Sequence, residues 1–183
     1  MAIPSVTVVS VASSPHHGFS KDIRERIRLL GGLGVEGDAH CGETVKHRSR
    51  VAVDPSQPNL RQVHLLDAET LDALNREAFE LAPGDLGENV LTSGIDLRAL
   101  PRGTRLRLGA DAVVELTGLR NPCTQIETFR RGLLARVVGK TASGEIERRA
   151  GVMAVVVAGG EIRTGDAIAV SLPELPHERL ERV

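Results

Sequence analysis

The sequence predicts a mainly β fold, a β-barrel or closed β-sandwich with a few short helices. Short runs of β-branched and apolar residues follow one another closely, whereas only one segment has clear helical spacing. The 183 residues include 19 Gly and 9 Pro, which favours turns and irregular loops over long helices. No repeat or linker divides the chain, so we expect a single domain over residues 1–183, with its core at about 20–171 and a surface tail at 172–183.

The first third of the chain predicts strands separated by an irregular loop. Ser5–Val11 is rich in β-branched residues and bounded by prolines, which indicates a strand. Lys21–Leu30 fits both helical and strand spacing, and we favour a strand for its second half because Gly31-Gly32 ends it abruptly. Gly31–Gly42 holds five glycines in twelve residues, too many for a regular element, and it lacks the spacing of a phosphate loop. Its backbone amides could approach a ligand.

The middle of the chain contains the one clear helix signal. We expect a helix near Ala68–Phe79, with Asp67 capping its N-terminus. The apolar face of this helix would consist of Leu71, Leu74 and Ala78. Pro83-Gly84 ends the segment, and Gly84–Leu91 predicts a second polar loop that runs into a short strand.

The last third predicts further strands. Leu106–Thr117 has the pattern of a β-hairpin that turns at Gly109-Ala110-Asp111. Val152–Ala158 is the most strongly apolar strand signal in the chain, and after a glycine turn Ile162–Val170 would return, interrupted at Gly165-Asp166. Leu133–Val138 fits a short helix and a strand equally well.

Composition excludes several classes of protein. The net charge is −1, and the aromatic residues are three Phe with no Trp or Tyr, so neither an attractive field for nucleic acid nor a base-stacking platform is expected. No apolar run is long enough to cross a membrane. A signal peptide would require basic residues near the N-terminus, but no Lys or Arg precedes Lys21. We therefore expect a cytoplasmic protein with reduced thiols and with no nucleic-acid or membrane partner. The two cysteines, Cys41 and Cys123, do not make a disulfide framework.

The stretch Thr117–Phe129 carries the strongest signal for chemistry. Cys123 directly follows a proline in a loop that leaves a β run, with Arg120 and Asn121 on one side. Such a thiol can be a soft-metal ligand, a sulfur carrier or a nucleophile, or it can simply fill a gap in the core. A Pro-Cys step in a polar loop is unlike core packing, and Arg120, if close, would stabilise a thiolate. We therefore expect Cys123 to be functional.

Three loops are dense in polar groups: Gly37–Gly42, Gly84–Asn89 and Arg120–Gln125. Taken singly, each is most simply a turn, but loops at one mouth of a barrel would meet and form a site. A structural zinc site is not predicted, because the spacing of Cys41, His40 and the other histidines matches no standard finger. No local signature selects a histidine partner for Cys123.

Taken together, these motifs resemble the MOSC domain, named after the C-terminal part of molybdenum-cofactor sulfurases. The likeness covers nearly the whole chain. The residues that carry it are Gly34–His40, Arg61–Leu65, Pro83–Asn89, Asn121-Pro122-Cys123 and Gly151–Val170.

The resemblance implies a strongly bent β-barrel, similar to the barrel domain of pyruvate kinase, with the cysteine in a pocket at one end. In the family this cysteine is associated with a sulfane sulfur or with molybdenum in a pterin cofactor. By this likeness Cys123 would be the catalytic residue and the metal ligand, or would bear a persulfide. The resemblance also implies cofactor-binding roles for Arg61, Glu88, Asn89, Arg120, Asn121, Asp38 and His40.

Two functions follow as expectations. The first is a small molybdenum-cofactor oxidoreductase that reduces N-hydroxylated small molecules with electrons from a partner protein. The second is a sulfur carrier or cofactor-delivery module with a persulfide on Cys123, supplied by a separate cysteine desulfurase. The pyridoxal-phosphate-dependent desulfurase domain of the eukaryotic sulfurases has no counterpart in this sequence, so pyridoxal phosphate is only a family-level association. A plain binding or structural barrel remains a third alternative.

Overall fold

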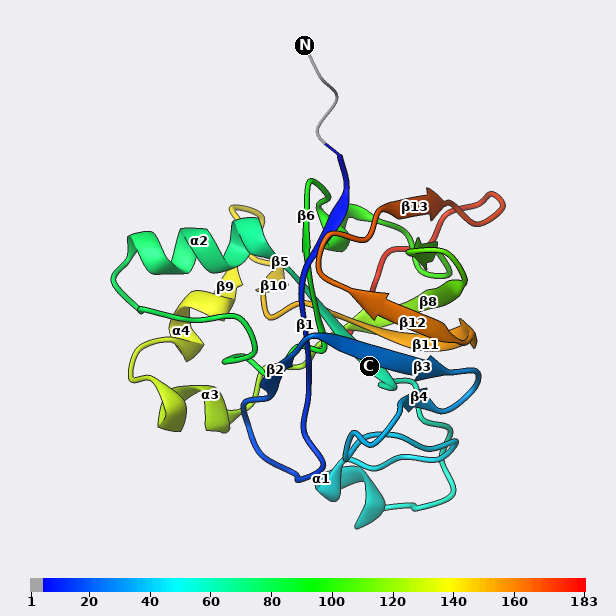
Figure 1. Cartoon of the computed structure of the whole chain (residues 1–183). Coiled ribbons are helices and arrows are strands. Elements are labelled where there is room, and N and C mark those ends of the chain that lie inside the picture. The colour runs from blue at the N-terminus through cyan, green and yellow to red at the C-terminus, as the bar shows by residue number, and fades with distance from the viewer. Residues whose placement is uncertain (1–4) are drawn as a thin grey trace.

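The computed structural model describes residues 5–183 and shows a mostly β protein with short helices (Figure 1). The main sheet has eight strands in the order β13-β7-β8-β11-β5-β6-β1-β2. In chain order these are β1 (Thr7–Ser13), β2 (Asp22–Arg24), β5 (Val63–Asp67), β6 (Val90–Ser93), β7 (Arg105–Leu108), β8 (Ala112–Leu119), β11 (Val152–Ala158) and β13 (Ile168–Ser171).

Two smaller sheets complete the β structure. One has the order β12-β3-β4, and the other is the hairpin β9-β10. Their strands are β3 (Arg26–Leu30), β4 (Gly34–Val35), β9 (Val138–Lys140), β10 (Ile146–Arg148) and β12 (Gly160–Arg163). The helices are α1 (Arg48–Val51), α2 (Ala68–Arg76), the 3-10 helix η1 (Leu97–Ala99), α3 (Thr124–Phe129) and α4 (Leu134–Val137).

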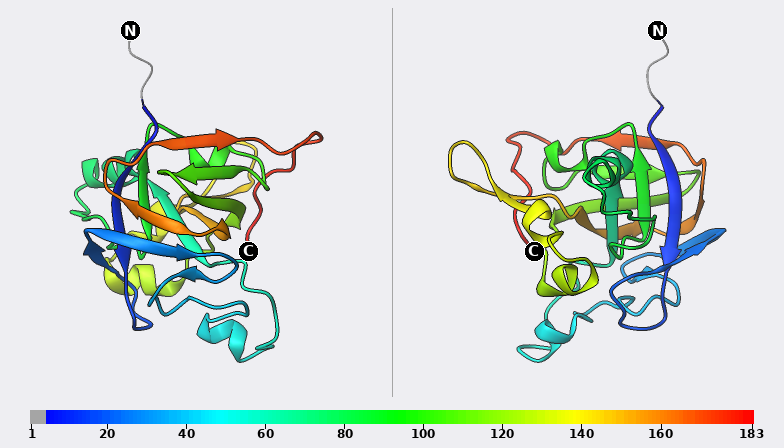
Figure 2. Two further views of the ribbon diagram at one scale, coloured as in Figure 1. Left: turned by 45° about the vertical axis from the view of Figure 1, so that its right-hand side comes forward. Right: turned by 90° about the vertical axis from the view of Figure 1, so that its left-hand side faces the viewer.

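The main sheet bends back on itself without closing (Figure 2). The start of β1 meets the segment before β13, where the Val8 amide donates to the Asp166 carbonyl at 2.9 Å and the Ile168 amide to the Val6 carbonyl at 2.8 Å. The edge strands β2 and β13 do not pair with each other in the described part of the chain. The mainly β prediction is confirmed, but the ladder is not a continuous barrel.

β5 and β6 form the only parallel pair among the strand pairs described for residues 5–183, and α2 connects them. Val63, Leu65 and Val90 belong to the core enclosed by the bent sheet. Leu66 and Leu91 point to the opposite face and pack in a second core with α2, α3 and α4, which gather on one side of the sheet in Figure 1. Strands buried on both faces lose the polar/apolar alternation, which is why the residue pattern does not predict a strand at β5.

Most local predictions are confirmed. The strand at the N-terminus, the hairpin β7-β8 and the strand β11 lie where expected, and Lys21–Leu30 forms the two short strands β2 and β3, which a bend at Glu25 separates. Asp67 caps α2 by accepting a hydrogen bond from the Thr70 amide at 2.9 Å. The ambiguous segment Leu133–Val138 is mostly helical, as α4, and leads into β9.

The predicted end of α2 is wrong. The helix stops at Arg76, and Ala78 is exposed with a φ of 66° instead of belonging to the apolar face. The cause is Asn75, whose side chain donates to the Leu81 carbonyl at 2.8 Å and accepts from the Leu81 amide at 2.7 Å. These two hydrogen bonds turn the backbone away from the helix axis, in the way that amide side chains compete with helical hydrogen bonds.

The tail after β13 returns to the body of the protein. Leu180 is buried, and the Leu119 amide at the end of β8 donates to the Glu181 carbonyl at 2.7 Å. The longest helix among residues 5–183, α2, has nine residues, which is too short to cross a lipid bilayer.

Gly151 provides a test of how tightly β5 and β11 are held together. It has a φ of +91°, and a Cβ at this position would collide with the Leu65 carbonyl and the His64 ring. Gly151→Ala should therefore cost about 3 kcal/mol in urea unfolding, from backbone strain and overpacking together. Gly144→Ala is the matched control, because Gly144 has a φ of +85° but an open surrounding, and it should cost only about 1 kcal/mol. Equal losses in the two variants would refute the tight packing.

Candidate functional site

A small cavity of about 80 Å³ lies where the three polar loops meet. His40 comes from Gly37–Gly42, Asn89 from Gly84–Asn89, and Cys123 from Arg120–Gln125. The predicted meeting of these loops thus occurs in the structure. The predicted site residues that line the cavity are His40, Arg61, Asn89, Arg120, Asn121 and Cys123.

The thiol of Cys123 is half-buried at the end of a well-supported strand. β8 is hydrogen-bonded to β7 on one side and to β11 on the other, and the Arg120 amide that follows donates to the Gly151 carbonyl at 3.0 Å. Cys123 comes directly before α3, and its thiol donates to the Gln125 side-chain oxygen at 3.5 Å. The backbone therefore fixes the position of the sulfur, and the only side-chain hydrogen bond described for it is the long one to Gln125.

Cys41 has a different environment. It does not line the cavity, and burial together with the charges of Asp38 and Glu36 raises the pKa of its thiol. The thiol of Cys41 is therefore weakened as a nucleophile.

Two arginines place positive charge beside Cys123. Arg120 donates to the Leu86 carbonyl at 2.5 Å, and its guanidinium lies 5.6 Å from the ring centre of Phe19. Arg61 donates to a main-chain oxygen of Val183, the last residue of the chain, while its buried Nε has no partner among the described residues. Burial and the charges of neighbouring arginines, chiefly Arg50, lower the pKa of Arg61 to about 10.

Arg120 forms no ion pair with an Asp or Glu side chain in residues 5–183, although the charge of Glu88 is near enough to act on it. Burying a cation without a counter-ion is costly. An anionic group in the cavity would offset this cost, so the arginines favour an anionic ligand close to the thiol.

Asp38 holds the surrounding loops together from behind the cavity. Its Oδ2 accepts from Lys21 Nζ at 2.5 Å and from Asn89 Nδ2 at 3.1 Å, and its Oδ1 accepts from the amide and Nδ1 of His40 at 3.0 and 3.3 Å. Burial alone would raise the pKa of Asp38, but the hydrogen bonds from His40 and the charge of Lys21 keep this pKa far below its usual range. Asp38 is thus a charged structural anchor, and it does not line the cavity.

Glu88 and Asn89 shape the second loop. Glu88 Oε1 accepts from the Gly84 amide at 2.5 Å, and burial raises the pKa of Glu88. Asn89 accepts from the His64 amide at 3.1 Å and donates to the Ala12 carbonyl at 3.1 Å, so it links β1 to β5. Glu88 lies behind the cavity wall, whereas Asn89 is part of the wall.

The histidines of the cavity wall differ in their hydrogen bonds. His64 is buried, and its Nε2 lies 2.7 Å from the Ala150 carbonyl, which can only accept, so Nε2 carries the hydrogen. Burial and the charge of Arg120 lower the pKa of His64 to about 3. Burial and the charge of Arg61 lower that of His47 to about 4. Both rings are therefore neutral at pH 7.

The sequence did not point to several residues of the wall. They are Phe19, Lys21, His47, His64 and Met153. The sequence around Lys21 indicates only a helix or a strand, and the pairing of Lys21 with Asp38 spans a loop that has no local signature. His64 belongs to the Arg61–Leu65 motif, but no neighbouring residue in the sequence indicates which face of a strand it occupies.

The described residues contain no group of three or more His, Cys, Asp or Glu side chains that could hold a metal ion by themselves. A metal bound at Cys123 would therefore have to bring most of its ligands with it.

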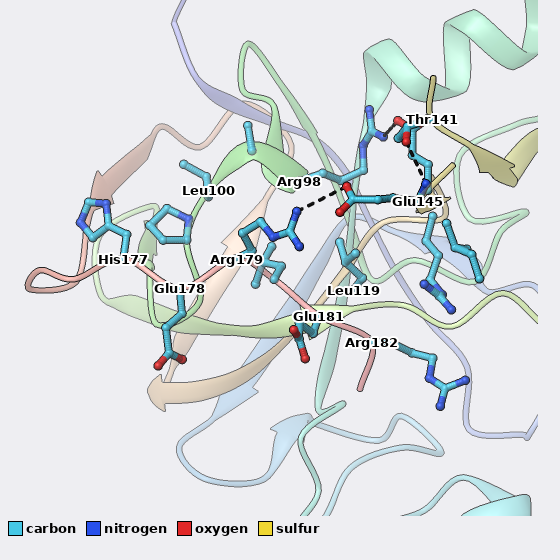
Figure 3. A pocket seen from close by; sticks show the side chains of 16 residues that line it. Arg98, Leu100, Leu119, Thr141, Glu145, His177, Glu178, Arg179, Glu181 and Arg182 are labelled. Atoms are coloured by element: carbon cyan, nitrogen blue, oxygen red, sulfur yellow. Dashed lines mark hydrogen bonds and ion pairs between the residues drawn. The ribbon is translucent and has the colours of Figure 1, made fainter. Parts of the chain in front are cut away.

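A larger groove of about 710 Å³ lies away from Cys123, between η1, the β9-β10 hairpin and the tail (Figure 3). Its charged side chains largely balance: Glu145 lies 3.6 Å from Arg179, and Glu147 lies 3.2 Å from Arg98. It contains neither a cysteine nor an unbalanced charge, so the smaller cavity is the better candidate for chemistry.

The buried His64 predicts a pH dependence of stability. Its pKa is about 3 in the folded protein and about 6.5 in the unfolded chain, so its contribution is complete above pH 6.5 and is lost as the pH falls towards 3. Between pH 6.5 and 4.5, wild type should lose about 2 kcal/mol more unfolding free energy than His64→Gln. Urea unfolding at several pH values measures this, with His16→Gln, an exposed histidine, keeping the wild-type slope. Parallel curves for wild type and His64→Gln would contradict the prediction.

Comparison with known proteins agrees with the resemblance. The model of the MOSC domain family matches residues 36–169. No curated protein matches the chain. Among solved structures, the chain is similar to the YUAD protein from Bacillus subtilis, with 24% identity and a TM-score of 0.73 over 92% of this chain and 97% of that one.

Two further structures show the same fold. YiiM from Geobacillus stearothermophilus has 15% identity and a TM-score of 0.65, covering 95% of this chain and 79% of that chain. YiiM from Escherichia coli has 17% identity and a TM-score of 0.61, covering 93% and 72%. These identities support a shared fold alone, whereas the family match spans most of the sequence. The chain therefore belongs to the MOSC domain family.

Proposed function

We propose that this protein binds a molybdenum-pterin cofactor through Cys123 and reduces N-hydroxylated small molecules with electrons from a partner protein. The observation that supports the proposal most is the half-buried thiol beside Arg61 and Arg120, two cations that form no ion pair with an Asp or Glu side chain in the described chain. A thiolate is a soft ligand that suits a thiophilic metal, and arginines suit an anionic cofactor.

The residues present fit such a cofactor. The orphaned Nε of Arg61 is a buried donor that a phosphate oxygen would satisfy. A single protein thiol is enough when the cofactor brings the remaining ligands of the metal. The cavity of about 80 Å³ can admit a metal with small ligands but not a whole pterin, so the larger part of the cofactor would stay outside it.

The chain supplies position, charge and exclusion of water. When bound, the cofactor would supply the exchange of two electrons. Cys123 would hold the metal, Arg120 would offset negative charge, and Phe19 and Met153 would provide an apolar part of the wall. Reducing an N-hydroxylated amine takes two electrons and two protons, breaks the N–O bond, and gives the amine and water. The electrons would come from a reduced flavoprotein or iron–sulfur protein.

A sulfur carrier is the second candidate. It is favoured by the partial exposure of Cys123 and by the absence of other cysteines in the cavity wall, which leave its thiol open to a donor protein. In this function Cys123 would accept a sulfane sulfur from a cysteine desulfurase and pass it on.

Molybdenum content tests the first candidate. Protein purified from a host that makes the cofactor should contain close to one molybdenum per chain, and Cys123→Ala should lose at least ~90% of it because the metal ligand is gone. Cys41→Ala is the matched control and should keep the wild-type content, since Cys41 is outside the cavity. The measurement is elemental analysis by mass spectrometry. A Cys123→Ala protein that is folded and keeps its molybdenum would refute metal ligation by this residue.

Persulfide transfer tests the second candidate. After incubation with a cysteine desulfurase and cysteine, the intact mass should rise by about one sulfur atom, about 32 Da, and the addition should map to Cys123 because the thiolate is the acceptor. Cys41→Ala should be labelled normally and Cys123→Ala not at all. An unlabelled wild type whose Cys123 still reacts with iodoacetamide would count against a carrier function.

A further inference from the structure

Asp38 and His40 form a carboxylate–imidazole pair at the cavity. The Asp38 carboxylate accepts from His40 Nδ1 at 3.3 Å and from the His40 amide at 3.0 Å, so both the backbone and the ring of His40 are held. Because a carboxylate can only accept, Nδ1 carries the hydrogen. This leaves Nε2 as the ring nitrogen that is available to a ligand in the cavity, whose wall includes His40.

From this pair we infer that His40 is a catalytic proton donor and that Asp38 is its positioning residue. The inference rests on the proposed reduction of N-hydroxylated compounds. As the N–O bond breaks, a proton on Nε2 would pass to the departing oxygen, which leaves as water. The second proton, which the nitrogen of the product needs, would come from solvent, and the two electrons from the reduced partner protein. Solvent would then reprotonate Nε2.

The other polar groups of the cavity are less suited to this step. Lys21 is bound to Asp38 at 2.5 Å, with only 6% of its side chain exposed. His64 uses its Nε2 hydrogen for the Ala150 carbonyl. His47 has a hydrogen bond to Ser49 Oγ at 3.0 Å and no carboxylate to support a charged ring. Arginines hold their protons too tightly to act as acids.

Several charged and titratable groups surround His40, the proposed proton donor. Asp38 lies on one side, with Lys21 behind it, and the His17 ring stands edge-on to His40 at 5.3 Å between ring centres. The His47 ring centre is 6.3 Å away, and Arg61 lines the same cavity. Burial, followed by the charges of His40 and Arg48, lowers the pKa of His17. Among the described residues, Asp38 is thus the one carboxylate that is hydrogen-bonded to His40. Such a carboxylate holds the imidazole of a proton donor in its orientation.

The kinetic test uses cofactor-loaded protein, phenylhydroxylamine as the substrate and reduced methyl viologen as the electron source. His40→Gln should lower kcat by about 10² to 10⁴-fold and leave KM and molybdenum content near the wild-type values. His40→Ala should regain activity as imidazole is added, which a purely structural role would not produce. His16→Gln, in the neighbouring loop and outside the cavity, is the control and should match wild type. A kcat of His40→Gln within threefold of wild type would overturn the inference.

A second readout needs no cofactor. Nitrogen-15 NMR of the cofactor-free protein should show His40 with its hydrogen on Nδ1, because Asp38 accepts it. A wild-type His40 with a bare Nδ1 would also overturn the assignment. If wild type itself binds no molybdenum and reduces nothing, the proposed function fails. If wild type is active and His40→Gln is equally active, only the proton donor fails.

Discussion

The site depends on the buried carboxylate of Asp38. This one group accepts hydrogen bonds from Ser14, Lys21, His40 and Asn89, which lie on three separate segments of the chain. Burying a charge costs several kcal/mol of folding free energy unless the charge is paired and hydrogen-bonded. The fold is therefore stable only when these partners surround the Asp38 carboxylate. The carboxylate itself stays outside the cavity. The wall is therefore organised by an interaction that a ligand never touches.

The arginines of the cavity wall are likewise held in place by groups of the protein itself. Arg120 is fixed by a backbone carbonyl and by the face of Phe19, and Arg61 by a main-chain oxygen of Val183. The contacts of Arg120 orient its guanidinium group without forming an ion pair. Arg120 thus keeps positive charge in the cavity wall beside the thiol, whereas the charge of Asp38 is already matched by Lys21. An anionic ligand would meet the charge of Arg120 without displacing an internal ion pair.

Local signals in the sequence were enough for much of the fold and for part of the site. The strand β11, the hairpin β7-β8 and the capping residue Asp67 follow from side-chain pattern and turn chemistry within a few residues. Contacts between distant residues could not be predicted in this way. The pairing of Lys21 with Asp38 depends on how two loops meet, and Glu88 is a cavity residue by motif but a loop support by geometry. Motif residues mark the region of a site, whereas only the fold separates those that face a ligand from those that hold the wall.

β5 constrains how this protein can vary. Within four consecutive residues it supplies Val63 and Leu65 to the enclosed core, His64 to the cavity wall and Leu66 to the helical layer. A strand alternates its faces with a period of two, so a shift by one residue would exchange all of these environments at once. Insertions or deletions in β5 should thus be eliminated by selection, while the exposed turn of the β9-β10 hairpin can change in length. The length of β5 is therefore constrained more strongly than that of the hairpin turn, because this one strand contributes to the enclosed core, the cavity wall and the helical layer.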